Sequence, residues 1–270
     1  MNHIPSNFPK LFDTHTHLSD KKFDSDRKEV LQRCDEWLEG WINVGSDLDS
    51  TKKSIAIANE FSKSFASSGI HPHDASAHSY QEIEEIISLY EEPNVIAAGE
   101  MGLDFFYDNS PRKTQIEIFE RQLLAAKKYS MPCIIHVRDA FDEFFQTVKK
   151  VDYCNGVVHC FTGNLEQAKK VIELGFYTSF GGIITFKNAH DVRESMLSIP
   201  LEKLLLETDC PYLAPVPMRG KRNEPSYISF VATKVSELRN VDLEELLQSC
   251  YQNALKCFQL KAKIEYDSNN

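Results

Sequence analysis

Short apolar runs alternate with amphipathic segments along almost the whole chain. In each amphipathic segment the apolar residues recur every three or four positions, as they do on one face of a helix. Each apolar run is too short for a helix and is bounded by polar residues, which is typical of a buried strand. The eight runs occupy positions 10–12, 41–45, 65–70, 95–98, 131–135, 156–158, 176–180 and 204–206.

The segments between the runs predict helices. Residues 26–39 carry one apolar stripe, and the weakest helical pattern lies near 192–197. Ser110 and Pro111 predict a helix start, with Ser110 as the N-cap and Pro111 at the first helical position. Two helices are expected to finish the chain, the second of them beginning at Asp242.

Eight strand–helix units predict a closed parallel (β/α)8 barrel, the TIM-barrel fold. An open doubly wound sheet has the same periodicity. The count of eight, and the polar residues that end strands throughout the chain, favour the barrel. At 270 residues with 42% hydrophobic content, one domain over 1–270 is expected, with its core at about 10–260 and a frayed tail at 266–270.

Composition limits the expected location and partners of the protein. No apolar run approaches the ~20 residues that cross a bilayer, and the start lacks the pattern of a signal peptide, so a cytoplasmic protein without a membrane partner is expected. The seven cysteines lack a Cys-x-x-Cys pair and are expected to be reduced thiols. The net charge of −10 argues against a broad basic surface for duplex nucleic acid, although bound cations can invert the field locally. A monomer is the simplest expectation.

Acidic and imidazole side chains follow most of the apolar runs. In a barrel the carboxyl ends of all strands open onto one face, so these side chains are expected to converge. They are His15, His17, His71, His73, Glu100, His136, His159, Glu207 and Asp209.

Such a set of nitrogen and oxygen donors suits Zn, Mn, Mg, Co or Ni, and it holds enough donors for two ions. Glu100, on the fourth strand, is the candidate for a bridging carboxylate. Two ions in one site can activate a shared water, so the predicted chemistry is hydrolysis.

Several motifs together resemble the TatD family of metal-dependent deoxyribonucleases, within the amidohydrolase-like barrels. The resemblance runs in order and without gaps from about residue 11 to residue 257. The motifs are FDTHTHL (12–18), GIHPH (69–73), GEMGLD (99–104), HVRDA (136–140), HCFTG (159–163) and ETDCPYLAP (207–215), which continues to RGKRNEP (219–225).

The resemblance implies a two-metal centre. One ion would be held by His15, His17 and Asp209, and the second by His136 and His159. Glu100 would bridge the two ions. Asp209 would also accept a proton from the attacking water, so Glu100 and Asp209 are the expected catalytic residues.

The implied substrate is DNA, either single-stranded or at strand ends, cleaved exonucleolytically. An alternative is a metal-dependent hydrolase of esters or amides, such as an aminoacyl-tRNA deacylase, which needs the same metals and a pocket for an acyl group. A protein that binds metal or nucleic acid without catalysis is disfavoured, because all six expected ligands are present.

The sequence leaves two possible roles open for each of three further side chains. Asp13 either orients an imidazole or caps the backbone as a buried carboxylate. Glu207 either reaches a third ion or belongs to a hydrogen-bonded layer of the barrel. His71 either contacts a phosphate or binds an additional, weaker ion, whereas His73 is expected to be structural.

Basic and aromatic residues near the motifs are candidates for substrate contacts. Arg138 and Arg222 are expected to neutralise phosphate charge. Arg222 belongs to a basic cluster with Arg219 and Lys221. The aromatic run 105–107 can stack on nucleobases. The remaining groups are expected away from the site: Cys160 and Cys210 in the core, His78 and His190 on the surface, and His3 in a loose terminus.

Overall fold

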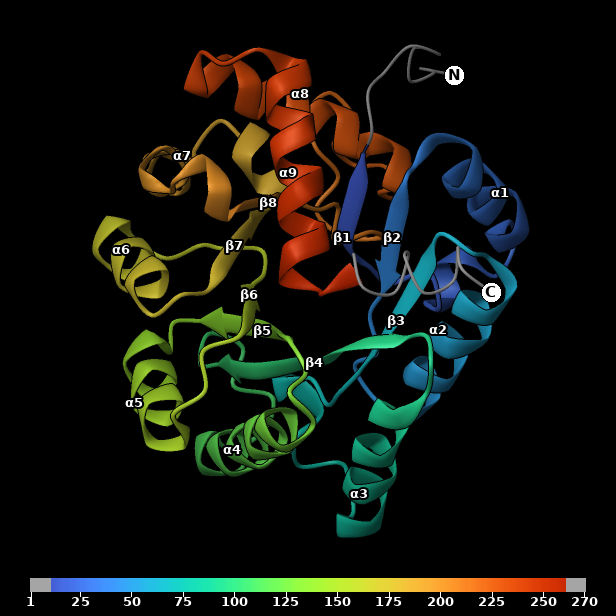
Figure 1. Cartoon of the computed structure of the whole chain (residues 1–270), viewed down its shortest axis with the longest axis vertical. Coiled ribbons are helices and arrows are strands. Elements are labelled where there is room, and N and C mark those ends of the chain that lie inside the picture. Colours follow the sequence, from blue (N-terminus) through green and yellow to red (C-terminus); the bar gives the residue numbers. More distant parts are fainter. Residues whose placement is uncertain (1–10, 261–270) are drawn as a thin grey trace.

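Eight parallel strands form the wall of a barrel in the computed structural model, which describes residues 11–260. Neighbouring strands follow chain order around the wall, and the helices lie outside it (Figure 1). The predicted (β/α)8 barrel is therefore confirmed. The strands are β1 (Phe12–Thr16), β2 (Gly40–Asn43), β3 (Ser64–Ser68), β4 (Val95–Asp104), β5 (Cys133–Arg138), β6 (Gly156–Val158), β7 (Tyr177–Phe180) and β8 (Leu204–Leu206).

The barrel closes where β1 meets the segment that follows β8. The amide of Asp209 donates to the carbonyl oxygen of His15 at 3.0 Å, and the amide of His17 donates to that of Cys210 at 2.8 Å. These backbone hydrogen bonds join two motifs that lie almost 200 residues apart in sequence. They hold His15, His17 and Asp209 side by side.

Nine α-helices and six 3₁₀ turns connect the strands within the described residues. The α-helices are α1 (Arg27–Trp37), α2 (Leu48–Glu60), α3 (Tyr80–Ser88), α4 (Arg112–Tyr129), α5 (Phe141–Val151), α6 (Leu165–Glu173), α7 (His190–Ser198), α8 (Ile228–Arg239) and α9 (Leu243–Cys257). The 3₁₀ turns are η1 (Lys21–Phe23), η2 (Pro72–Asp74), η3 (Leu89–Glu91), η4 (Gly182–Thr185), η5 (Leu201–Lys203) and η6 (Pro225–Tyr227). None of these helices is long and apolar enough to cross a membrane.

Two predicted helix starts had different outcomes. Asp242 caps α9 by accepting hydrogen bonds from the next turn, as expected. The prediction of Ser110 as the N-cap of α4 is wrong, because Pro111 occupies that position. The Ser110 hydroxyl instead donates to the carbonyl oxygen of His73 at 2.8 Å, which ties two loops together. The predicted tail at 266–270, His3 and residue 10 of the first run lie outside the described residues.

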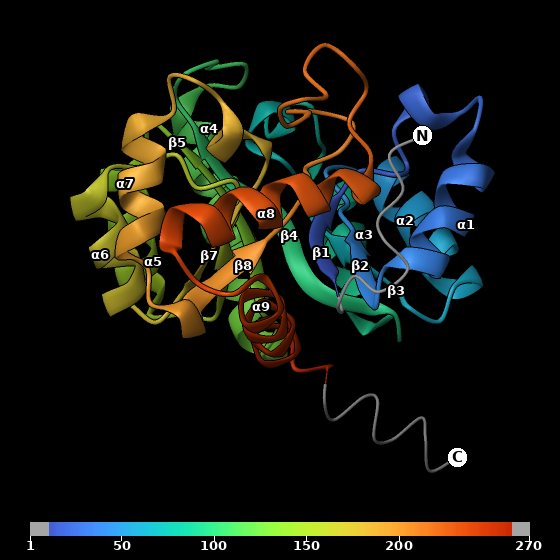
Figure 2. The same cartoon turned by 90° about the horizontal axis from the view of Figure 1, so that it is seen from above.

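The two ends of the barrel differ in chemistry. At the amino ends of the strands, apolar side chains such as Phe12, Phe65 and Leu205 pack against the end of α9, including Phe258. Figure 2 shows α9 on one side of the barrel and the long connection after β8 rising on the other. The apolar end is thus closed, and the polar residues lie at the carboxyl ends.

Candidate metal centre

The structure brings the six expected metal ligands together at the carboxyl ends of five strands. His15 lies in β1, Glu100 in β4 and His136 in β5, while the others follow directly on β1, β6 and β8. His15, Glu100 and His159 are buried, and His17, His136 and Asp209 are partly exposed toward the mouth. The predicted convergence is observed.

Two glycines place Glu100 at the centre of this group. Gly99 and Gly102 have φ values of +131° and +142°, and a Cβ on either would press against a carbonyl oxygen of β5. The register of β4 against β5 shifts between Ala98 and Met101. Because β4 continues through this irregularity to residue 104, Glu100 lies inside the strand rather than after its end.

Two imidazoles lie beside one carboxylate oxygen of Glu100, and Asp209 lies beside both imidazoles; we call His15, His17 and Asp209 the Oε2 set. Glu100 Oε2 lies 3.4 Å from His15 Nε2 and 3.6 Å from His17 Nε2. Asp209 Oδ1 lies 3.4 Å from His17 Nε2 and 3.8 Å from His15 Nε2. The two imidazole nitrogens are 3.0 Å apart and face the same point.

Three imidazoles surround the other carboxylate oxygen, and we call them the Oε1 set. Glu100 Oε1 lies 2.7 Å from His159 Nε2, 3.3 Å from His136 Nδ1 and 3.3 Å from His71 Nε2. His71, for which the sequence left two roles open, therefore lies beside the carboxylate with the two expected ligands. Its ring is 4.7 Å from that of His136.

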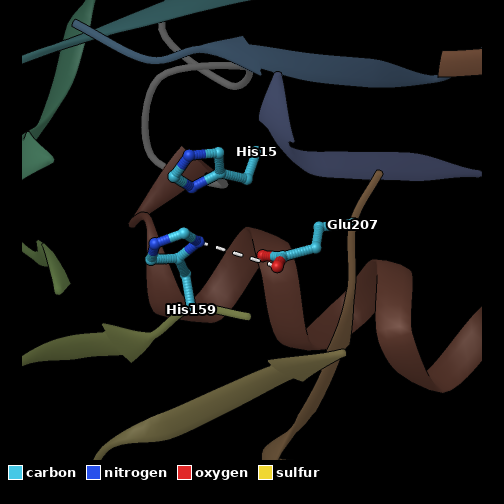
Figure 3. A group of neighbouring side chains, drawn as sticks. All are labelled: His15, His159 and Glu207. Atoms are coloured by element: carbon cyan, nitrogen blue, oxygen red, sulfur yellow. Dashed lines mark ion pairs between the residues drawn. The ribbon is translucent and has the colours of Figure 1, made fainter. Parts of the chain in front are cut away.

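Two further carboxylates lie behind the imidazoles of the Oε1 set. Asp104 Oδ2 is 3.0 Å from His136 Nε2, on the side of the ring that faces away from Glu100. Glu207 Oε1 is 3.6 Å from His159 Nδ1, and Figure 3 shows this carboxylate beside the His159 ring, which stacks on His15. The hydrogen bond to Asp104 fixes the tautomer of the His136 imidazole, whereas the contact between Glu207 and His159 is too long for a hydrogen bond.

Asp104 is the functional candidate that sequence reasoning missed. Its Oδ2 also accepts from His73 Nε2 at 3.1 Å, so one oxygen connects two imidazoles. These hydrogen bonds hold the pKa of Asp104 far below its usual range despite burial. A signal was present, because Asp104 follows Glu100 by four residues in one strand and shares its face.

The groups around Glu100 favour its ionised form, and they shift the pKa values of the surrounding imidazoles in different directions. Burial opposes ionisation of Glu100, yet the surrounding imidazoles hold its pKa well below the usual range. Burial lowers the pKa of His15, and it lowers that of His71 to about 4. Burial also acts against protonation of His159, but the neighbouring Glu100 and Glu207 raise its pKa well above the usual value.

These donor atoms fit divalent cations. Nitrogen and oxygen donors form groups of three within 4.8 Å of one another, namely His15 with His17 and Glu100, His71 with Glu100 and His136, and His15 with His159 and Glu207. Imidazole and carboxylate ligation suits Zn, Mn and related ions. Binding requires neutral imidazoles and therefore releases protons from the site.

The contacts of Asp13 favour one of its two predicted roles, whereas those of Glu207 leave both of its predicted roles open. Asp13 accepts hydrogen bonds from the amides of His15 and Thr208 and from the Thr208 hydroxyl, so its contacts are those of a backbone cap. Burial raises its pKa to about 8. Glu207 accepts a hydrogen bond from Ser179, which fits a hydrogen-bonded layer.

Arg138 and Arg222 differ in whether acidic side chains pair with them. Arg222 forms a two-pronged ion pair with Asp26 and a further one with Glu224, so its donors are held by the protein. Arg138 makes no ion pair with any described residue and lies over the ring of Phe106. We therefore leave Arg222 out of the proposed substrate contacts and keep Arg138.

Two minor expectations need correction. Cys210 is buried as predicted, but Cys160 is partly exposed. Its positive φ of 42° ends the alternation of strand faces directly after β6. His190 is exposed as expected, whereas His78 is partly buried and its ring nitrogens lack a hydrogen-bond partner among the described residues.

Comparison with known proteins agrees with the geometry. The family model for TatD related DNases matches residues 12–259. The chain is 40% identical over 253 residues to the uncharacterized metal-dependent hydrolase YabD of Bacillus subtilis, covering 93% of this chain and 99% of that protein. It is 33% identical over 244 residues to the 3'-5' ssDNA/RNA exonuclease TatD of Klebsiella pneumoniae, covering 87% and 93% of the two chains.

A solved structure shows the same architecture. The crystal structure of YjjV, a TatD homologue from Escherichia coli, superposes with a TM-score of 0.87 at 31% identity, covering 92% of this chain and 98% of that one. Family match, relatives and structure thus cover the same barrel. The chain belongs to the TatD-related DNase family of metal-dependent hydrolases.

Proposed function

We propose that this chain hydrolyses phosphodiester bonds at the ends of single-stranded nucleic acid, using two divalent cations. One observation carries the proposal: the ligand candidates divide between the two oxygens of a single carboxylate, Glu100. A carboxylate with a separate donor set near each oxygen can bridge two cations, an arrangement that suits a two-metal hydrolase. The relative from Klebsiella, named as an exonuclease on single-stranded DNA and RNA, supports the substrate class.

Each donor set would hold one cation. His15, His17 and Asp209 belong to the first, on Glu100 Oε2. The second includes His136 and His159, with His71 as an additional imidazole on Oε1. When bound, two such cations polarise a phosphoryl oxygen and lower the pKa of a shared water.

Asp209 is the proposed proton acceptor. It lies at the mouth, with a partly exposed side chain, whereas Glu100 is buried below it. Burial opposes its ionisation, but a hydrogen bond from His17 lowers its pKa below the usual value. An ionised carboxylate at this edge can take a proton from the attacking water and pass it to solvent.

Arg138 is the proposed phosphate contact at the same mouth. It ends β5 two residues after His136 and pairs in register with Asp104, and its guanidinium lies over the rings of Phe106 and Tyr107. An unpaired guanidinium can donate two hydrogen bonds to one phosphate. Its charge matters because the protein as a whole is acidic, with a net charge of −10.

An activity screen tests the proposal. Purified protein with Mg²⁺, Mn²⁺ or Zn²⁺ is offered single-stranded DNA, duplex DNA, RNA and aminoacyl esters, and bound metal is counted by mass spectrometry. We expect release of nucleotides from single strands and two ions per chain, with Asp209→Asn as the inactive control. Cleavage of aminoacyl esters without any phosphodiester cleavage would overturn the proposed substrate, and a single tightly held ion at full activity would overturn the two-metal arrangement.

A further inference from the structure

Exposed aromatic side chains lie beside both donor sets, and the proposed function does not use them. Phe106 and Tyr107 are each 55% exposed after β4, and Tyr212 is 42% exposed after β8. Single exposed rings are common on proteins, but exposed apolar groups gathered beside a polar site often mark a surface that binds a ligand. Their positions on opposite sides of Glu100 suggest contacts with the substrate on both sides of the reacting bond.

The first aromatic group is fixed to the metal centre through Asp104. Asp104 Oδ1 accepts hydrogen bonds from the amides of Phe106 and Tyr107 at 3.1 and 2.9 Å, while Oδ2 accepts from His136. The Tyr107 ring also meets the His73 ring edge-on at 5.4 Å. One carboxylate therefore sets the position of both rings relative to a proposed ligand.

A cation completes this first group, which we call the β4 platform: Phe106, Tyr107 and Arg138. The guanidinium carbon of Arg138 lies 3.9 Å from the ring centroid of Phe106 and 4.8 Å from that of Tyr107. Because Arg138 makes no ion pair within the described residues, its charge stays available to a phosphate. The platform thus offers a ring face and a phosphate donor side by side.

The second group, which we call the β8 station, consists of Tyr212 and Lys22. The Tyr212 ring meets that of His17 edge-on at 5.9 Å, so it borders the Oε2 set. Its hydroxyl donates to Asp20 at 2.8 Å, and Lys22 Nζ lies 4.2 Å from the ring centroid. Here an exposed ring and a cation border a proposed ligand directly.

A similar pair elsewhere serves as a contrast. Tyr80 on α3 is 71% exposed and lies under Arg121, but the guanidinium of Arg121 is paired with Glu84. That cation is paired within the protein, and the Tyr80 ring makes no ring contact with an imidazole among the described residues. The β4 platform and the β8 station instead combine an exposed ring and a cation with a contact to an imidazole at the strand ends: His73, which shares Asp104 with His136, and the proposed ligand His17.

We propose that the β4 platform and the β8 station each stack one nucleobase, on opposite sides of the phosphate that is cleaved. This inference rests on the proposed function and adds the conformation of the bound substrate. The substrate is an unpaired strand, and the two bases beside the reacting bond turn in opposite directions, one toward the β4 platform and the other toward the β8 station. Aromatic faces accept any base, so sequence should matter little. Paired bases cannot separate in this way, so duplex interiors are excluded.

Abasic substrates test the proposal. The substrates are single-stranded DNA oligonucleotides with an abasic residue at either the terminal or the penultimate nucleotide. KM and kcat are measured with Mn²⁺ for the wild type and for three variants. The variants are Tyr212→Leu, the double variant Phe106→Leu/Tyr107→Leu and the control Tyr80→Leu. For the wild type and the control we expect either abasic residue to raise KM by roughly 5- to 100-fold. Tyr212→Leu should become insensitive to one position, and the double variant to the other.

Metal content and melting temperature accompany the kinetics, so that a folding defect or a loss of metal is recognised. Variants that remain sensitive to both abasic positions, or a wild type insensitive to either, would overturn the stacking proposal while leaving the nuclease proposal standing. Absence of cleavage of every oligonucleotide with every metal would overturn both.

Discussion

The two sides of Glu100 are built in different ways. On the Oε2 side a carboxylate, Asp209, belongs to the donor set itself and lies within 4 Å of both imidazole nitrogens. On the Oε1 side all donors other than Glu100 are imidazoles, and carboxylates lie behind two of them. Apart from the shared Glu100, negative charge therefore lies next to one proposed cation and one imidazole ring away from the other.

This difference shows how each side keeps its geometry. The Oε2 donors are aligned by backbone hydrogen bonds between β1 and the segment after β8, which side-chain substitutions leave intact. The Oε1 donors depend on side-chain hydrogen bonds, chiefly that between His136 and Asp104. The two sides should therefore respond to different substitutions.

Glu100→Gln should have the largest effect, because it removes the charge that both sides share. We expect loss of both cations and a fall in activity beyond the ~10- to 100-fold that loss of a partner behind a ligand typically costs. Metal content by mass spectrometry and initial rates on single-stranded DNA are the measurements. Two retained cations with a near-normal rate would show that the carboxylate does not bridge.

Asp104→Asn should affect only the Oε1 side. An amide oxygen is a weaker acceptor for His136, so we expect affinity for one cation to fall by about 10- to 100-fold while the other is unchanged. Calorimetric titration of metal into the apo protein separates the two sites. Asp13→Asn is the matched control, since Asp13 is also buried at the strand ends but contacts backbone amides and a hydroxyl, and it should retain both affinities.

Equal weakening of both sites in Asp104→Asn would contradict the division of the centre into two sides. So would a comparable loss of affinity in the Asp13 control, because it would assign the effect to a general disturbance of the mouth. A melting-temperature measurement on both variants shows whether folding is affected alike.

Periodicity was sufficient to predict the barrel and the convergence of ligands. Strand runs of period two placed His15 and His17 on one face, and eight repeats of one unit determined the topology. The length of β4 did not follow from periodicity. Its apolar run ends at residue 98, while the strand continues to Asp104 through two glycines with positive φ. Asp104 was missed for that reason.

Contacts between loops were the other feature that the sequence did not predict. Arg222 was expected to meet a phosphate, but it pairs with Asp26, which is 196 residues away in sequence. No local pattern encodes such a pair, because it depends on how the connection after β8 returns over the segment before α1. The lack of an ion pair for Arg138 among the described residues was equally unpredictable, since it depends on which partners the nearby acidic side chains find in the fold, as Asp104 finds His136 and His73.

The ion pair between Arg222 and Asp26 leads to the smallest predicted effect. The hydrogen bond from Arg222 lowers the pKa of Asp26 in the folded protein. The ion pair therefore stabilises the folded protein fully above the pKa of an unfolded-state aspartate, about 3.9. This stabilisation is lost as the pH falls through the lower pKa of Asp26 in the folded state. The pair is partly exposed, so Asp26→Asn should cost at most about 1 kcal/mol at pH 7.

Thermal unfolding measured from pH 7 to pH 3 checks this expectation: the gap between wild type and Asp26→Asn should narrow as the solution becomes acidic. Because Arg222 belongs to the connection that borders the Oε2 side, the variant should also increase hydrogen exchange around Tyr212 and leave the β4 platform unchanged. A gap that stays constant with pH, or faster exchange at Phe106 and Tyr107, would mean that the ion pair does not act on one side of the mouth alone.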